Sequence, residues 1–529
     1  MKILFLNQHT GTRTMPMASA CLASALESRF GDEVDCPIME LGPGFPIEST
    51  ARKAAELQPD LIALTLYVWS REDLLSLAAA LPAAYGSGLV PPVIVGGPEV
   101  TADPSTIQNH PAVDMAVIGE GEGAVVALVT KIFSSPSIPT ADVLASFPAP
   151  YTLQPTVDLD DLANPWKAKS IVHQRYEDVV WELTRGCPFA CHFCFESKGS
   201  GIVRHKSLKR AAEELRCITE RGEENIFILD PTFNASPDRA ASLLQLFLNN
   251  APSLHYHMEI RTEFLDEEQA ALFAELGCTV QIGLQTSRED VGEKIGRPYS
   301  PEKFMEKVHL LHSEGVTYGF DLIYGLPDDT LEGFLESLDF ALSCAPNHID
   351  IFPLSVLPGT RLRDDASERG INYLTTVPYT VLGSTDFPEE SLASASNWTA
   401  AAHEFYNGFR AVPWFLTLCS SLDLRPVELI EAWRDEPSPA DLGRFIRNLA
   451  ASLDKADIGA VLADVAQLFT LESASRENLP LPASMELTFD PAELTAHLEM
   501  GISDPEELLA FVSRAPGTYP ADELIRRWL

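Results

Sequence analysis

The sequence predicts an α/β protein that contains a doubly wound parallel sheet, an incomplete β/α barrel and a mostly helical C-terminal region. Short apolar runs that end in glycine or polar residues alternate with helical stretches over residues 1–134, and the same alternation returns over residues 176–370. Residues 371–529 show mainly the periodicity of amphipathic helices. These observations divide the chain into three domains and one linker, residues 135–175.

The first domain is built from continuous apolar runs, which are typical of parallel strands covered on both faces. We expect strands at 2–7, 60–69, 91–100 and 114–123, and helices at 15–29, 49–58 and 71–85. A doubly wound sheet binds its ligands beyond the carboxyl ends of its strands. The residues that end these strands are therefore candidates for ligand contacts.

The second domain follows a linker rich in proline and acidic residues that lacks periodicity. Strands are expected at 178–185, 225–230, 255–261, 279–285, 317–326 and 348–357. Helical stretches of the length that a parallel crossover needs separate them. Six such units predict a partial (β/α)6 barrel rather than the full eight. In the C-terminal region we expect helices at 441–453 and 504–515 and a strand at 484–489.

Composition narrows the class of protein. The 529 residues include 46% hydrophobic and 22% charged residues, which is typical of a globular chain. The formal charge of -38 repels phosphate backbones and anionic lipid surfaces, so we expect neither nucleic acid nor a membrane as a partner. Without an apolar run long enough to span a bilayer or to act as a signal peptide, the chain is predicted to be soluble and cytoplasmic. Its nine cysteines are then expected to be reduced.

Three of those cysteines, Cys187, Cys191 and Cys194, follow the first expected barrel strand at the spacing C-x3-C-x2-C. Thiolates bind soft metals, and such short spacings let one loop surround one centre. A structural zinc site would need a fourth ligand, whereas three thiolates on a 4Fe-4S cluster leave one iron open. The motif therefore predicts a 4Fe-4S cluster. Zinc or coincidental core cysteines are the alternatives.

The cysteine motif, with Phe193 before its third cysteine, resembles the radical S-adenosylmethionine (SAM) superfamily, whose open iron chelates SAM. The segments HMEIRTE, IGLQTS, IGRP and DLIYGLPDDT resemble the barrel of oxygen-independent coproporphyrinogen oxidase. This resemblance implies that SAM is held by Phe193, Glu259, Gln285, Arg297 and Asp321. For Glu259 and Arg297, taken singly, an ordinary polar residue is the alternative.

The second barrel strand ends in LDPTFN, where this superfamily places a loop that contacts the amino group of SAM. The usual glycine pair followed by an acid is replaced here. Asp230 and Asn234 are the candidates for the amino contact. The alternative for Asn234 is a cap on the following helix.

The first domain resembles the Rossmann-like cobalamin-binding domain of a class of radical SAM enzymes. The segments TLYVWS, VGGPEVTADP and VIGEGEGAV carry this resemblance. It implies cobalamin contacts from Tyr67, Trp69, Gly96, Gly97, Glu99, Gly119, Glu120 and Gly121. Glycine lets backbone approach a macrocycle closely, but it also forms ordinary turns, and the two aromatic residues could equally belong to the core.

His9 is the candidate for a cobalt ligand. Other cobalamin folds carry D-x-H-x-x-G after the first strand, and NQHTGT (7–12) keeps the histidine, loses the aspartate and shifts the glycine. Without that aspartate the imidazole lacks the partner that would orient it. A plain loop histidine is the alternative interpretation.

Taken together, the resemblance implies a cobalamin-dependent radical SAM enzyme that methylates an unactivated carbon of a small molecule. The implied cofactors are a 4Fe-4S cluster, SAM and cobalamin, and the implied partner is an electron donor such as flavodoxin or ferredoxin. A cyclase or rearrangement enzyme with the same cofactors is the first alternative. A non-catalytic cobalamin-binding sensor is the second.

Overall fold

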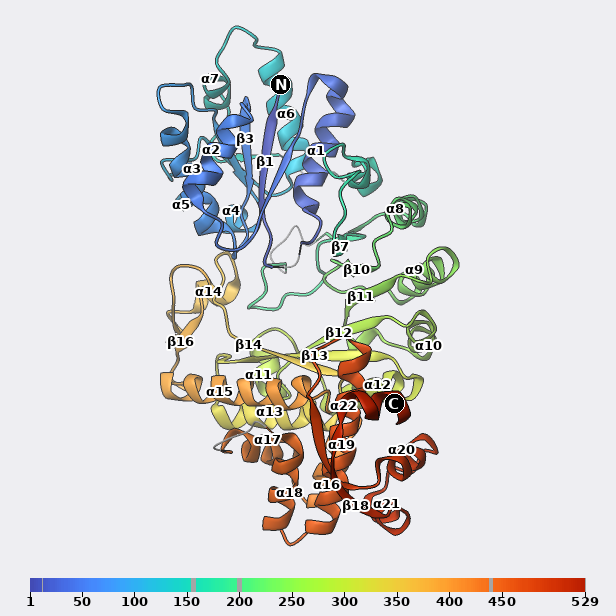
Figure 1. Ribbon diagram of the computed structural model, residues 1–529. Coiled ribbons are helices and arrows are strands. Elements are labelled where there is room, and N and C mark those ends of the chain that lie inside the picture. Colours follow the sequence, from blue (N-terminus) through green and yellow to red (C-terminus); the bar gives the residue numbers. More distant parts are fainter. Residues whose placement is uncertain (12, 154–157, 197–201, 437–440, 529) are drawn as a thin grey trace.

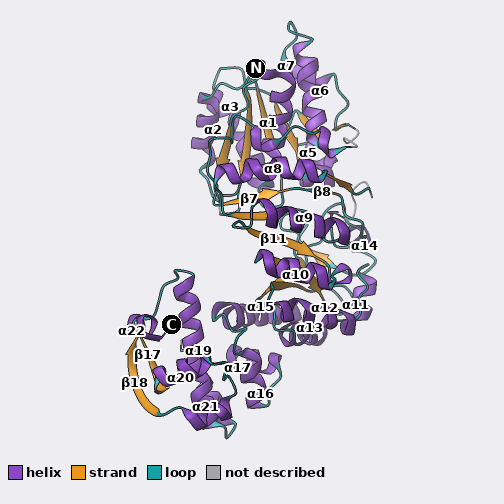
Figure 2. Ribbon diagram, turned by 90° about the vertical axis from the view of Figure 1, so that its right-hand side faces the viewer, coloured by secondary structure: helices purple, strands orange, loops and turns teal. Residues whose placement is uncertain are grey.

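The computed structural model describes residues 1–11, 13–153, 158–196, 202–436 and 441–528. Figure 1 shows three parts that follow one another along the chain: an N-terminal sheet with its helices, a second sheet, and a C-terminal helical region. Figure 2, turned by 90°, shows the same order along the long axis. Both six-stranded sheets are parallel throughout.

The N-terminal sheet confirms the doubly wound prediction. Its strand order is β2-β1-β3-β4-β5-β6. The strands are β1 (Ile3–Gln8), β2 (Ile38–Leu41), β3 (Leu61–Thr65), β4 (Val93–Gly96), β5 (Met115–Ile118) and β6 (Tyr151–Thr152). The helices are α1 (Met17–Phe30), α2 (Ile47–Glu56), α3 (Arg71–Tyr85), α4 (Pro98–Ala102), α5 (Pro104–Gln108) and α6 (Gly121–Phe133).

Helices cover both faces of this sheet. Buried residues of α1 and α6 share one hydrophobic cluster with the sheet, and those of α2 and α3 share a second cluster on the other face. Every residue of β1 and β3 is buried, as the continuous apolar runs predict. The strands expected at 60–69, 91–100 and 114–123 ran longer than β3, β4 and β5, because their last residues form the loops at the carboxyl edge.

The expected linker is more ordered than its composition indicated. It contains α7 (Thr140–Ala145) and β6, which pairs with β5 and extends the N-terminal sheet. Two 3-10 turns follow, η2 (Leu159–Asp161) and η3 (Pro165–Lys167). These elements were not predicted, because strands and turns this short carry no periodicity in sequence.

The second sheet is the predicted partial barrel of six strands, in the order β14-β13-β12-β11-β10-β7. Its strands are β7 (Asp178–Trp181), β10 (Asn225–Ile228), β11 (His255–Ile260), β12 (Thr279–Gln285), β13 (Thr317–Tyr324) and β14 (His348–Pro353). The crossover helices are α8 (Leu208–Arg221), α9 (Pro237–Asn250), α10 (Glu267–Leu276), α11 (Glu289–Lys294), α12 (Pro301–Glu314) and α13 (Leu331–Ser343), with the turn η5 (Thr262–Phe264).

The first barrel strand is shorter than expected. It ends at Trp181, and β8 (Thr184–Arg185) pairs antiparallel with β9 (Arg204–His205) instead of continuing the sheet. The carboxylate of Asp230 accepts bonds of 2.8 Å from the backbone N–H groups of both Leu183 and Thr184. These donors therefore have a side-chain partner where a longer strand would pair with backbone.

The C-terminal region is mainly helical, as predicted. Helix α14 (Arg361–Asp365) precedes this region and follows the last barrel strand. The elements after residue 370 are β15 (Asn372–Tyr373), β16 (Val381–Gly383), α15 (Glu389–Ala402), the π-helical turn η6 (His403–Gly408), α16 (Phe415–Leu422), α17 (Pro426–Arg434), α18 (Leu442–Ser452), α19 (Ala456–Arg476), β17 (Ser484–Phe489), α20 (Pro491–Glu499), α21 (Pro505–Phe511), β18 (Arg514–Pro520) and α22 (Ala521–Trp528).

One expected C-terminal helix, 504–515, was partly wrong. Helix α21 stops at Phe511, and the chain continues as β18, which pairs with β17. Long-range pairing with β17 decides this end of the helix, and no local signal shows it. In the part of the chain that the structure describes, no helix combines the length and the apolarity needed to cross a membrane.

Candidate active site

One large cavity lies between the N-terminal sheet and the barrel. Its volume is about 1920 Å³, and residues of both sheets line it, together with Glu477 of the C-terminal region. Sites for a single small molecule usually measure about 300–1,000 Å³. The cavity therefore has room for more than one ligand.

The cavity opens where both sheets are expected to bind ligands. Thr65, Gly96 and Val117 line it at the carboxyl ends of β3, β4 and β5. Strands β10 to β14 turn alternate side chains toward the same space. Figure 1 shows the N-terminal strands ending above the barrel, so the N-terminal sheet and the barrel line the cavity from opposite sides.

All three predicted cysteines line this cavity from the loop that connects β8 to β9. The thiols form no disulfide, and burial raises the pKa of Cys187. The backbone of His192 fixes the loop, since its N–H donates to Ile295 O and its carbonyl accepts from the N–H of Leu362, both at 2.8 Å.

The donor set suits an iron–sulfur cluster better than a single ion. Among the described residues, no three His, Cys, Asp or Glu side chains converge as ligands of one metal ion. The thiols of Cys187, Cys191 and Cys194 instead share one cavity wall, and each can hold a different iron of a cubane. Phe193 lines the cavity beside them and packs against the core.

Four of the predicted SAM residues meet at the carboxyl half of the barrel. Glu259 on β11, Gln285 at the end of β12, Arg297 and Asp321 on β13 all line the cavity. The guanidinium of Arg297 donates to Gly283 O, and its Nη1 lies 3.9 Å from Cys191 Sγ. Arg297 therefore connects the cysteine loop with strand β12.

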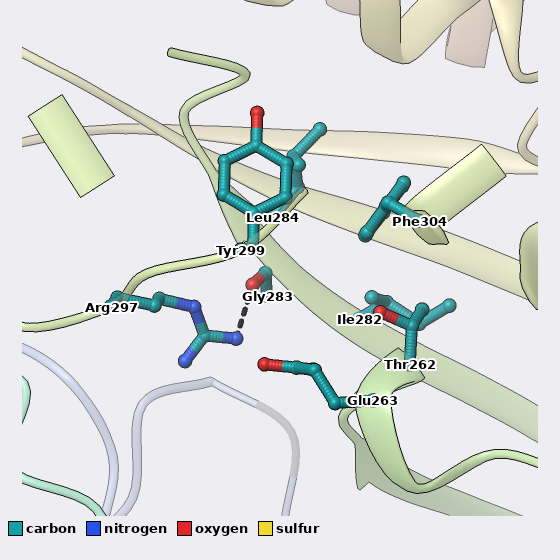
Figure 3. Close-up of a pocket in the computed structure, with 8 residues that line it drawn as sticks. All are labelled: Thr262, Glu263, Ile282, Gly283, Leu284, Arg297, Tyr299 and Phe304. Atoms are coloured by element: carbon teal, nitrogen blue, oxygen red, sulfur yellow. Dashed lines mark hydrogen bonds between the residues drawn. The ribbon is translucent and has the colours of Figure 1, made fainter. Parts of the chain in front are cut away.

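Figure 3 shows the surroundings of Arg297. Its guanidinium points between Gly283 of β12 and Glu263 of η5. Burial opposes ionisation of Glu263, but its bond to Arg261 and the nearby Arg297 lower the pKa of that carboxyl. Position 283 is glycine, and an added Cβ there would collide with Gln285 Nε2 and lie 3.2 Å from Arg297 Nη2.

Gln285 has a backbone conformation that its residue type rarely adopts. Its φ is +68°, and the register between β12 and β13 shifts between Gly283 and Gln285. A non-glycine residue held in this region stores strain, which is typical of functional sites. The irregularity turns the Gln285 side chain to the cavity.

Two carboxyls of this group have raised pKa values. Burial raises the pKa of Glu259. Burial also raises the pKa of Asp321 to about 7, against the hydrogen bond from Gln281 and with support from Glu259 and Asp350. Such carboxyls are poised to pair with a donor or cation that enters the cavity.

Asp230 and Asn234 do not line the cavity. Asp230 is 2% exposed, and its carboxylate accepts hydrogen bonds from backbone N–H groups at the start of β8. Asn234 is fully buried, and its amide exchanges two hydrogen bonds with the backbone of Arg261. The structure thus gives both residues bonds that join neighbouring strand ends, and the expected contact with an amino group has no support from their position.

Six of the nine predicted cobalamin residues line the cavity: Tyr67, Gly96, Gly97, Gly119, Glu120 and Gly121. At Gly97 the backbone passes so close to β3 that an added Cβ would lie 2.7 Å from Leu66 O, and its φ is +108°. At Gly119, with φ +79°, an added Cβ would meet nothing within 4 Å. Gly97 is therefore required by close backbone packing, whereas Gly119 leaves backbone open to a ligand in the cavity.

His9, Trp69 and Glu99 lie outside the cavity lining. His9 packs against Gly42, and its Nδ1 is buried without a hydrogen-bond partner among the described residues. Trp69 stacks on Tyr67 at 4.5 Å and donates from Nε1 to Gln8 O. The loop-histidine interpretation fits the position of His9 better than cobalt ligation.

Glu99 has a different neighbourhood from the one that the sequence predicted. It is buried, accepts from Arg71 Nη1 at 3.0 Å and accepts from the hydroxyl of Tyr379 at 2.6 Å. Arg71 also donates to the Tyr379 hydroxyl at 2.7 Å. This triad joins the N-terminal domain to the segment beside β16.

The barrel has a polar interior that was not predicted from the sequence. His257, Gln281, His348 and Asp350 line the cavity deeper along the same strands. Gln281 Nε2 donates to Asp321 at 2.7 Å and to Asp350 at 3.3 Å, while its Oε1 lies 2.8 Å from His348 Nε2. The signal was available, because most of the alternate positions on one face of β11, β12 and β14 are polar.

This interior also has an aromatic side. Phe227 of β10 stacks on His257 at 4.4 Å, and burial lowers the pKa of His257 to about 4. Phe227 and Phe352 are 44% and 51% exposed, although both line the cavity. The deeper cavity is thus part apolar and part polar, as expected for a substrate site.

Two protein families match separate parts of the chain. The B12 binding domain matches residues 3–129, and the Radical SAM superfamily matches residues 181–341. These ranges contain the glycine-rich strand ends and the cysteine loop, respectively.

Similar proteins are found by sequence and by structure. The chain is 26% identical over 378 residues to the uncharacterized methyltransferase PH0819 of Pyrococcus horikoshii. The aligned region covers 66% of this chain and 78% of that protein. It is 26% identical over 377 residues to the cobalamin-dependent radical SAM methyltransferase TokK of Streptomyces tokunonensis, covering 65% of this chain and 52% of TokK. The match therefore spans about half the length of TokK.

A solved structure supports the fold over the whole chain. The cobalamin-dependent SAM radical enzyme OxsB with aqua-cobalamin bound aligns with a TM-score of 0.61 and 12% identity, covering 100% of this chain and 83% of that one. The cofactors of these families are a 4Fe-4S cluster, SAM and cobalamin. The cavity is lined by the three cysteines, by polar residues of the barrel and by the glycine-rich strand ends. The chain carries a B12-binding domain followed by a radical SAM domain and is homologous to the cobalamin-dependent radical SAM methyltransferases.

Proposed function

We propose that this chain is a cobalamin-dependent radical SAM methyltransferase that acts on an unactivated carbon of a small molecule. One observation carries the proposal: the three cysteines and the glycine-rich strand ends of the B12-binding domain line the same cavity of about 1920 Å³. When bound, the cofactors supply the reductive cleavage of SAM and the methyl group. The residues of the chain hold, orient and enclose them.

The carboxyl half of the barrel is assigned to SAM. Cys187, Cys191 and Cys194 hold the cluster, and Phe193 forms the wall beside it. The guanidinium of Arg297 suits a carboxylate, while Glu259 and Asp321 suit hydroxyls or an ammonium group. Gln285 contributes an amide from its strained position. These roles rest on cavity lining and on the chemistry of each side chain.

The N-terminal wall is assigned to cobalamin. Gly96, Gly97, Gly119 and Gly121 offer backbone without side chains, and Tyr67 adds an aromatic ring. The cavity between this wall and the barrel is then left for the substrate. Phe227, Phe352 and the Gln281 network line that part.

The proposal also includes the domain boundaries and the partners of the protein. We assign residues 1–134 to cobalamin, 135–175 to a linker, 176–370 to the barrel and 371–529 to a C-terminal domain. An electron donor such as flavodoxin or ferredoxin, and a cytoplasmic location, complete the assignment. The formal charge of -38 is the reason that nucleic acid is left out.

The products formed from SAM test this function. Anaerobic protein with cluster and cobalamin is incubated with SAM and a reductant, and the products are measured by mass spectrometry. 5′-Deoxyadenosine together with S-adenosylhomocysteine supports methyl transfer. The former alone supports a cyclase or rearrangement enzyme, and neither product supports a non-catalytic sensor.

The cluster assignment has its own test. Cys191→Ala should abolish the binding of iron and sulfide, because a cubane held by two thiolates is not retained. Cys278→Ala is the matched control: Cys278 is equally buried, lies outside the cavity and has a pKa raised to about 12 by burial. Equal iron in both variants would contradict the assignment.

A further inference from the structure

Arg185 joins the two domains immediately before the cysteine loop. It ends β8, two residues ahead of Cys187, and its side chain is 13% exposed. Each of its nitrogens donates to a different carboxylate: Nε to Glu182 at 2.9 Å, Nη1 to Glu120 at 2.9 Å and Nη2 to Glu122 at 2.6 Å. Glu182 belongs to the barrel, but Glu120 and Glu122 belong to the loop and helix that follow β5.

A second arginine reinforces this contact from the other end of the loop. Strands β8 and β9 pair antiparallel, with Arg185 opposite Arg204, so this two-residue ladder closes the base of the cysteine loop. Arg204 also bonds the carboxylate of Glu120. Both residues at the base of the loop therefore bond one side chain of the N-terminal domain.

The base of the loop is tightly packed. Gly186 has φ +90°, and an added Cβ would lie 2.6 Å from Ile202 O. Glu120 on the opposite side lies between Gly119 and Gly121, two of the glycines that line the cobalamin wall. Movement of either loop relative to the other would thus break buried, charge-assisted hydrogen bonds.

Charge explains why the contact depends on Arg185. Glu120, Glu122 and Glu182 surround one guanidinium, and all of these groups line the cavity wall. Without that cation the three carboxylates would repel one another, because partly buried like charges are poorly screened. The planar guanidinium of arginine holds its donors in fixed directions toward the three acceptors, whereas the compact ammonium of a lysine carries rotatable donors and would impose no such geometry.

We propose that Arg185, with Arg204 opposite, is a positioning residue that fixes the cysteine loop against the loop after β5 and so sets the separation of the cluster from cobalamin. The inference rests on the proposed places of these two cofactors. A residue that merely stabilises the fold would leave that separation unchanged. The distance between the two centres is therefore the quantity to measure.

The triad of Arg71, Glu99 and Tyr379 provides a matched control. It also joins the N-terminal domain to a later part of the chain through buried hydrogen bonds, but it touches neither the cysteine loop nor the loop after β5. Tyr379→Phe removes the hydroxyl from this contact while it leaves Arg185 and its carboxylates in place.

The experiment uses the full chain loaded with cluster and cobalamin. The cluster is reduced with sodium dithionite, which leaves cobalamin as paramagnetic cob(II)alamin, and electron paramagnetic resonance measures how strongly the cluster accelerates the spin relaxation of cobalt. This dipolar effect falls steeply with distance. Arg185→Gln should lose much of the acceleration with iron, sulfide and cobalamin contents unchanged, whereas Tyr379→Phe should keep it.

Other outcomes are equally informative. Wild-type relaxation in a fully loaded Arg185→Gln protein would overturn the inference and leave the proposed function standing. A wild-type chain that binds no cluster or no cobalamin would overturn both. If Arg185→Gln does not fold, Glu122→Gln, which removes one of the three carboxylate charges, should give an intermediate relaxation rate; a wild-type rate in that variant would also overturn the inference.

Discussion

At the scale of single residues, burial and charge decide which groups are poised for chemistry. Asp321 illustrates this, because its carboxyl lies between Glu259, Asp350 and Gln281, and burial raises its pKa to about 7. Its role in the cavity thus depends on neighbours that come from three other strands. Sequence identifies the aspartate, but its protonation state follows from packing.

The raised pKa of Asp321 predicts that the free energy of unfolding of the cofactor-free protein depends on pH. An unfolded aspartate ionises near pH 4, so between about pH 4 and 7 the unfolded state releases a proton that the folded state keeps. The free energy of unfolding therefore falls as pH rises through this range. Asparagine cannot ionise, so Asp321→Asn should remove this dependence on pH. The free energy of unfolding of the variant, minus that of wild type, should be about 1–3 kcal/mol larger at pH 8 than at pH 5.

Urea unfolding of the cofactor-free protein at both pH values checks this prediction. Asp238→Asn is the control, because Asp238 is exposed in the first turn of α9. A gain from Asp321→Asn that is the same at both pH values would show that the carboxyl is not held protonated.

At the scale of elements, the ends of the strands carry the site. Gly97 follows β4 and Gly119 follows β5, and both have positive φ values. Their surroundings differ, because the missing Cβ of Gly97 would collide with backbone and that of Gly119 would enter open space. The first glycine is needed by the fold, and the second keeps the cavity wall open.

The two glycines should respond differently to alanine. Both variants place a side chain on backbone with a positive φ, which costs about 1–3 kcal/mol. Gly97→Ala adds a contact of 2.7 Å to Leu66 O, which the backbone cannot relieve, so its free energy of unfolding should fall further. Gly119→Ala should fold but retain less cobalamin. Urea unfolding and the visible spectrum of bound cobalamin separate the two effects, and equal cobalamin retention in Gly119→Ala and wild type would contradict the proposed wall.

At the scale of the whole molecule, the C-terminal region completes the barrel. Asn407 of η6 donates to Ile349 O at 2.7 Å and accepts from Ile349 N at 3.0 Å, so its amide pairs with the outer strand β14 as a further strand would. One hydrophobic cluster continues from the barrel strands to Phe405, Trp414 and Trp433. An open parallel sheet edge is thereby covered.

This edge contact predicts a stability effect far from the cavity. Asn407→Ala leaves two backbone groups of β14 without partners and should lower the free energy of unfolding by about 1–3 kcal/mol. Asn250→Ala is the control, because its amide bonds only the preceding turn of α9 at the surface. Equal urea midpoints for the two variants would show that Asn407 does not support the strand.

Much of this architecture could be predicted because its signals are local. Continuous apolar runs located both sheets, and the spacing of Cys187, Cys191 and Cys194 located the cysteine loop. The short strands β2 and β6 gave no periodic signal, and the end of α21 depended on pairing with distant β17. Local pattern therefore predicted elements well where burial is continuous and poorly where a distant partner decides.

The candidate site divides in the same way. Residues with backbone or thiol chemistry, such as Gly97 and Cys191, line the cavity. Asp230, Asn234 and Glu99 do not, because nearby backbone or side-chain groups use their polar atoms. A sequence shows that a carboxylate or amide is present, but not which partner reaches it first.

The amino-acid sequence by itself determined the order of the two sheets, the cysteine loop and the glycine-rich strand ends, since each depends on neighbours along the chain. Only the tertiary structure decided that these features share one cavity, that Gln281 and His348 line its interior, and that Arg185 bridges the domains. Those facts require contacts between residues far apart in sequence, such as the 65 positions between Glu120 and Arg185. Such contacts form when the chain packs, and no local pattern encodes them.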